Sequence, residues 1–81
     1  MSGHRVVVAD DHPLFREGVA RTLQESGRFA VVATAASGAE AVDKTKGAIF
    51  DLVVLDVGLP DTDGRELCKR LRKQGVKCPI V

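Results

Sequence analysis

Leu52-Val53-Val54-Leu55-Asp56 is an uninterrupted apolar run that ends in a carboxylate, and Val57-Gly58-Leu59-Pro60-Asp61 follows it directly. An earlier apolar run, Val6-Val7-Val8-Ala9, ends in the same way at the acidic pair Asp10-Asp11. Apolar runs of this length are typical of strands that are buried on both faces, as in a parallel sheet. Helical crossovers bring the carboxyl ends of parallel strands to one edge of the sheet, so we expect the three carboxylates to meet there.

Three carboxylates at one edge of a sheet need a cation. At about 4 Å separation and an effective dielectric constant near 20, each ionised pair repels by roughly 4 kcal/mol. An all-oxygen site with few carboxylates suits Mg²⁺, which keeps several waters and takes its remaining ligands from substrate phosphate. A carboxylate beside Mg²⁺ and a phosphoryl donor can also be the nucleophile of the reaction. The sequence therefore predicts a Mg²⁺ site at which a carboxylate can act as nucleophile and form an aspartyl phosphate.

The stretches around these carboxylates resemble the receiver domain of bacterial two-component response regulators, especially the branch with LuxR-type DNA-binding output domains. The matching residues are 6–18 (VVVADDHPLFREG) and 51–64 (DLVVLDVGLPDTDG). The resemblance implies that a sensor histidine kinase phosphorylates Asp56 in a Mg²⁺-dependent reaction. It also implies that Asp11, Asp56 and the backbone carbonyl of Gly58 ligate Mg²⁺ and that Asp10 holds a metal-bound water. DNA would be contacted only through an output domain that these 81 residues do not include.

Local explanations exist for the same residues. Asp56 could be an ordinary Asp that starts a loop, although the companion stretch at residues 6–18 makes this reading weak. The pair Asp10-Asp11 could cap the helix that follows, because Asp is favoured at helix N-termini. Capping needs only one oxygen and so explains one of the two. A lone His at a helix start is more often solvated than chemically active, and we expect the same of His12.

The periodicity of apolar residues predicts alternating strands and helices. We expect strands at about 5–9, 29–35 and 52–56, and helices from Pro13 to Gly27, from the capping box Ser37-Gly38-Ala39-Glu40 to Gly47, and from a cap at Asp63 to Gly75. Residues 78–81 read as the start of a fourth strand. The resemblance implies an α/β, flavodoxin-like doubly wound parallel sheet in the order 2-1-3-4-5. We therefore expect residues 1–81 to be the N-terminal portion of a receiver domain, incomplete after three βα units.

Composition narrows the function classes. A chain of 81 residues with 44% apolar content allows one small domain. A net charge of +1 indicates no nucleic-acid surface, and no apolar stretch approaches the roughly 20 residues that span a bilayer. No signal-peptide pattern begins the chain, so we expect a cytoplasmic protein. Cys68 and Cys78 fit no zinc template and are expected to be reduced thiols.

Three alternatives stay open at this stage. An aspartate-nucleophile phosphatase resembles the pattern, but that family has a second Asp two positions after the nucleophile, where this chain has Gly58. A dinucleotide-binding fold lacks support, because the turn after the first strand is not glycine-rich. We expect the domain to be a signalling switch and not an enzyme. The most serious alternative is a truncated interaction module that cannot switch. We also expect the 81 residues alone to self-associate, by strand pairing or by exchange of elements between chains. The sheet edge beside the third strand would lack partners, and apolar sheet surface would be uncovered.

Overall fold

Strands and helices alternate along the described part of the chain. The computed structural model describes residues 4–56 and 59–81. The elements are β1 (His4–Ala9), α1 (Pro13–Glu25), β2 (Phe29–Ala35), α2 (Gly38–Thr45), β3 (Leu52–Leu55) and α3 (Gly64–Lys73). The expected elements are confirmed, and their ends differ from the prediction by no more than about two residues. No helix in these two ranges is long and apolar enough to cross a membrane.

The strands form one parallel sheet in the order β2-β1-β3, with β1 in the centre. Val6 to Ala9 pair with Leu52 to Leu55 in unbroken register, whereas the pairing with β2 shifts between Val6 and Val7. Beyond β3, the N–H of Val81 donates to the carbonyl of Val53 at 2.9 Å, and the N–H of Leu55 donates to the carbonyl of Val81 at 2.8 Å. The expected start of a fourth strand is therefore confirmed, and it lies beside β3.

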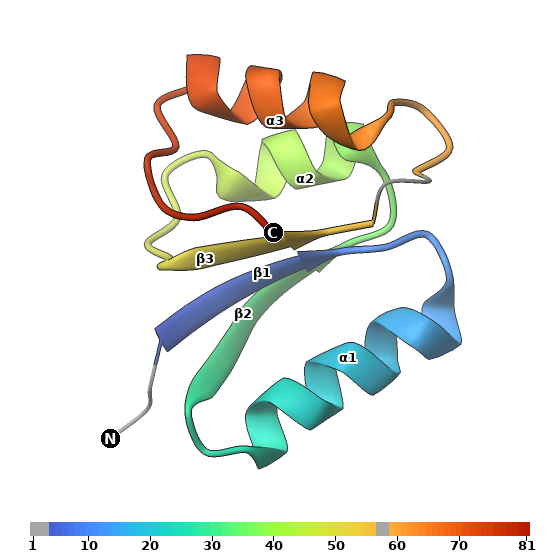
Figure 1. Cartoon of the computed structure of the whole chain (residues 1–81), viewed down its shortest axis with the longest axis vertical. Helices are drawn as coiled ribbons and strands as arrows, with labels where there is room; N and C mark the ends of the chain where they lie inside the picture. The colour runs from blue at the N-terminus through green and yellow to red at the C-terminus, as the bar shows by residue number, and fades with distance from the viewer. Residues whose placement is uncertain (1–3, 57–58) are drawn as a thin grey trace.

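Helices cover both faces of the sheet, α1 on one face and α2 with α3 on the other (Figure 1). The main core lies on the α2 and α3 face, where Val7 and Val53 of the sheet cluster with Leu67 and Leu71 of α3, all of them fully buried. Burying one such side chain contributes about 1.5–3 kcal/mol. The chain runs from β1 through α1 to β2 on one side of β1, and then through α2 to β3 on the other side. The doubly wound fold is therefore confirmed, and its switch point lies between β1 and β3.

The face under α1 is less closed than the opposite face. Val6 and Val8 are buried there, but no residue of α1 is buried. Leu14 and Phe15 at the start of α1 are 85% and 64% exposed. The apolar spacing therefore predicted the helix correctly, while the described residues supply too few neighbours to cover its apolar side chains.

The predicted helix caps are present with one revision. Ser37 Oγ accepts from the N–H of Glu40 at 3.1 Å, and Asp63 Oδ1 accepts from the N–H of Glu66 at 2.8 Å. The carboxylate of Glu40 bonds back to the N–H of Ala36, one residue before the position that a capping box usually uses. Each helix is followed by a glycine with positive φ, as predicted for Gly27, Gly47 and Gly75.

Candidate metal centre

The carboxylates predicted from the sequence do converge at one edge of the sheet. Asp10 follows β1 directly, and Asp56 follows β3 directly. The N–H of Asp56 donates to the carbonyl of Ala9 at 2.8 Å, which ties the end of β3 to the end of β1. Ligand atoms of Asp10, Asp11, His12 and Asp56 all lie within 4.8 Å of one another. Parallel pairing of β1 with β3 thus brings together residues 45 or 46 positions apart in the sequence.

Asp10 does not act as the helix cap that one alternative reading assigned to it. Helix α1 begins at Pro13, and His12 precedes it as the N-cap residue. Asp10 Oδ1 accepts from the N–H of His12 at 2.9 Å, outside the helix. This bond turns the chain between β1 and α1 and leaves the second oxygen of Asp10 for another partner. The capping explanation is therefore wrong for Asp10.

The oxygen Oδ1 of Asp11 is the strongest sign of a cation site. This atom is buried from solvent and has no hydrogen-bond donor in the described parts of the chain. His12 Nδ1 lies 3.0 Å away, but its geometry does not make a hydrogen bond. A buried carboxylate oxygen without a donor is costly unless a cation approaches it. The oxygen ligands of Asp10, Asp11 and Asp56 are also the ligand type that Mg²⁺ prefers, so these residues fit that ion.

Residues 6–81 match the response regulator receiver domain family. The chain belongs to this family. Two curated relatives come from Mycobacterium tuberculosis. The transcriptional regulatory protein TcrA is 44% identical over all 81 residues, which are 31% of that protein. The probable transcriptional regulatory protein NarL is 47% identical over 68 residues, or 84% of this chain and 32% of the relative.

Solved structures of receiver domains have the same fold. A LuxR-family two-component response regulator from Aurantimonas sp. SI85-9A1 superposes with a TM-score of 0.89 at 35% identity, over 98% of this chain and 56% of that one. The response regulator TrrA from Thermotoga maritima, solved in complex with Mg²⁺ and BeF, gives a TM-score of 0.85 at 36% identity, over 99% of this chain and 66% of that one. The chain spans about a third of the length of these curated relatives.

Two further residues of this receiver domain lie at the site, and sequence reasoning gave them little or no role. His12 places Nδ1 3.0 Å from Asp11 Oδ1 and 3.5 Å from Asp10 Oδ1, although 73% of its side chain is exposed. Arg16 Nη1 donates to the carbonyl of Asp10 at 2.8 Å. The signal for Arg16 was its position one helical turn after His12, which places it on the side of α1 that faces the end of β1.

Gly58, whose carbonyl was predicted as a metal ligand, lies outside the described residues. The three other predicted ligands lie at one place, as described above. An opening of about 250 Å³ adjoins them and is lined by Val8, Ala9, Asp10, Phe15, Val19, Val54, Leu55 and Asp56. Of the three carboxylates, those of Asp10 and Asp56 line this opening on the α1 face of the sheet.

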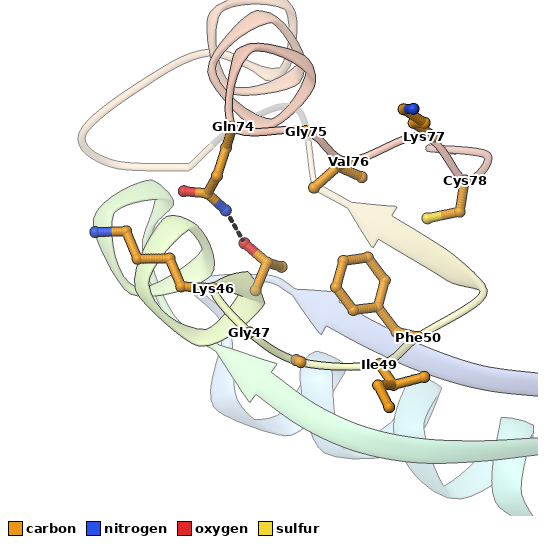
Figure 2. A pocket seen from close by; sticks show the side chains of 11 residues that line it. Lys46, Gly47, Ile49, Phe50, Gln74, Gly75, Val76, Lys77 and Cys78 are labelled. Atoms are coloured by element: carbon orange, nitrogen blue, oxygen red, sulfur yellow. Dashed lines mark hydrogen bonds between the residues drawn. The ribbon is translucent and has the colours of Figure 1, made fainter.

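A cavity of about 450 Å³, larger than this opening, lies at the C-terminal ends of α2 and α3, away from the carboxylates (Figure 2). Phe50 and Val76 form part of its wall, and Gln74 Nε2 donates to Thr45 Oγ1 at 2.8 Å across it. The lining residues include no Asp, Glu or His. This cavity therefore offers neither a carboxylate nucleophile nor a set of metal ligands.

Proposed function

We propose that this receiver domain accepts a phosphoryl group on Asp56 in a Mg²⁺-dependent reaction. The observation that supports the proposal best is the meeting of three carboxylates at the switch point, one of which has a buried oxygen without a donor. Ligands of open α/β sheets bind beyond the carboxyl ends of the strands at that point. Asp56 is the carboxylate that follows β3, where the family resemblance puts the phosphoacceptor.

The proposed reaction transfers a phosphoryl group from a phosphohistidine of a sensor kinase. An oxygen of the Asp56 carboxylate attacks the phosphorus, the bond between phosphorus and the histidine nitrogen breaks, and its electron pair stays on the imidazole. Mg²⁺ held at this site would neutralise charge on the transferred oxygens. Asp10, Asp11 and Asp56 would hold the ion, together with the carbonyl of Gly58. Arg16 fixes the backbone of Asp10, and the bond from Asp56 N–H to Ala9 holds the nucleophile beside it.

The proposal extends to partners and to the cell compartment. The two mycobacterial relatives are transcriptional regulators by name, which supports a role in controlling transcription through a DNA-binding output domain. A histidine kinase as phosphoryl donor and a cytoplasmic location follow from the same role. In this role the domain is a switch whose phosphorylation changes its contacts, and it turns over no separate substrate. The rival phosphatase reading is weakened by Gly58, because it needs a second carboxylate there.

The direct test is intact-mass analysis of the full-length protein after incubation with acetyl phosphate and Mg²⁺. We expect one added phosphoryl group in the wild type and none in Asp56→Asn. Asp51→Asn is the matched control, because Asp51 immediately precedes the same strand at its other end. It should gain the phosphoryl group normally. An adduct that persists in Asp56→Asn would refute the assignment of Asp56.

A further inference from the structure

The first turn of α2 is held by a residue from another part of the chain. The first N–H groups of a helix have no partner within the helix. In α2, the N–H of Gly38 donates to Asp61 Oδ1 at 2.8 Å, and the N–H of Ala39 donates to Asp61 Oδ2 at 3.0 Å. Ser37 satisfies the N–H of Glu40. Asp61 therefore completes the N-terminus of α2 from the connection between β3 and α3, 22 or 23 residues away in the sequence.

The backbone of α2 approaches this connection so closely at Gly38 that a larger residue there would require Thr62 to move. A Cβ atom at Gly38 would collide with the methyl group Cγ2 of Thr62 and would lie 3.2 Å from Asp61 Oδ1. Gly38 has no positive φ that would call for glycine. Contact between the two segments therefore explains this glycine, and the contact is between segments that no strand pairing holds together.

Charge on the carboxylate strengthens the contact. The N–H of Gly38 and then that of Ala39 lower the pKa of Asp61 below its ordinary value, and the positive charge of Arg70 on α3 lowers it further. An ionised carboxylate is also stabilised by the positive end of the α2 dipole. Asp61 is therefore charged at neutral pH and bonded by both of its oxygens.

The connection between β3 and α3 is anchored at three alternate positions. Leu59 is buried in the main core, Asp61 binds α2, and Asp63 caps α3. Of these anchors, Asp61 is the one that holds the connection to an element outside β3 and α3 by hydrogen bonds. Leu59 lies three residues after Asp56, so these anchors follow the candidate metal centre directly in the chain.

We propose that Asp61 is a positioning residue for the metal centre. By binding the first two N–H groups of α2, it fixes residues 59–63 against that helix and so sets the position of the β3–α3 connection at the edge that carries the carboxylates. This inference rests on the proposed Mg²⁺ site. It adds a function for α2, which contributes no ligand of its own to that site.

The test measures Mg²⁺ affinity and the α2 amides separately in the full-length protein, at neutral pH and at a temperature where every variant is folded. Asp61→Ala should remove the downfield shifts that a carboxylate gives the Gly38 and Ala39 amide protons, and should weaken Mg²⁺ binding about tenfold, as loss of a supporting partner typically does. Asp61→Asn keeps one acceptor oxygen and should fall between Asp61→Ala and the wild type. Asp43→Asn, which removes an exposed carboxylate from the same helix, controls for the lost charge and should bind Mg²⁺ normally.

A second pair of variants keeps the charge of Asp61. Gly38→Ala should displace Thr62 and weaken Mg²⁺ binding, and the double variant Gly38→Ala/Thr62→Ser should recover part of it because the colliding methyl group is gone. If the amide shifts of Asp61→Ala equal those of the wild type, the contact does not exist in solution. If the shifts change but Mg²⁺ affinity does not, Asp61 only stabilises the fold, and the proposal is wrong. Neither readout requires phosphorylation, so failure of Asp56 as acceptor is detected independently.

Discussion

Replacing Asp11 by Asn should stabilise the metal-free protein and destabilise it relative to the wild type once Mg²⁺ is present. The acidic ligand atoms lie within 4.8 Å of one another, and two unit charges at that distance repel by about 3.5 kcal/mol at an effective dielectric constant near 20. Asp10 and Asp11 are also neighbours in the unfolded chain, so part of the repulsion cancels. We expect Asp11→Asn to add about 1–2 kcal/mol to the free energy of unfolding without metal.

The assay is urea unfolding at pH 8 of the full-length wild type and Asp11→Asn, each with EDTA and with Mg²⁺. At a Mg²⁺ concentration 100 times Kd, the wild type gains about 2.7 kcal/mol, whereas the variant should gain much less. The order of stability should therefore reverse between the two conditions. Asp43 is exposed and is not one of the proposed metal ligands, so Asp43→Asn should show no such reversal of the order of stability.

Two results would contradict this reasoning. If Asp11→Asn is less stable than the wild type in EDTA, the carboxylate of Asp11 is held by a favourable contact and does not suffer net repulsion. If the variant keeps the full stabilisation by Mg²⁺, the ion binds elsewhere. Either result would remove the buried oxygen of Asp11 as the main support for the metal centre.

Three further outcomes are expected. Leu67→Ala should lower the free energy of unfolding in urea by about 2–5 kcal/mol, because Leu67 is fully buried. Ile49→Ala should change it by less than about 0.5 kcal/mol, because Ile49 is 69% exposed. Equal losses in the two variants would contradict the placement of the core. The N–H and guanidinium of Arg5 bind Asp51 and lower its pKa, so this contribution to stability is complete above the ordinary pKa near 3.8 and is lost as the pH falls through the lower folded value. Asp51→Asn should therefore flatten the pH dependence of unfolding below about pH 4, and an unchanged pH dependence would contradict the contact with Arg5. The 81 residues expressed alone should self-associate through the exposed apolar side chains of α1. A monomer whose sedimentation is independent of concentration would show that these side chains are stable in contact with solvent.

Local sequence determined the elements and their ends. The apolar runs before Asp10 and Asp56, the caps at Ser37 and Asp63 and the glycines that follow the helices all predicted their structures correctly. These features depend on backbone hydrogen bonds, φ preferences and side-chain periodicity within a few residues, so a linear reading is sufficient for them. The convergence of the carboxylates was also predictable, because parallel strands with helical crossovers have their carboxyl ends at one edge.

Contacts between distant segments required the tertiary structure. The sequence identified Asp10 as a possible helix cap, but the turn to His12 uses that oxygen instead. It gave no reason to link Asp61 with the N-terminus of α2, since the segments are more than 20 residues apart and either could have been solvated. Such contacts depend on the relative placement of packed elements, which is set by burial of the shared core and leaves no periodic pattern in the sequence.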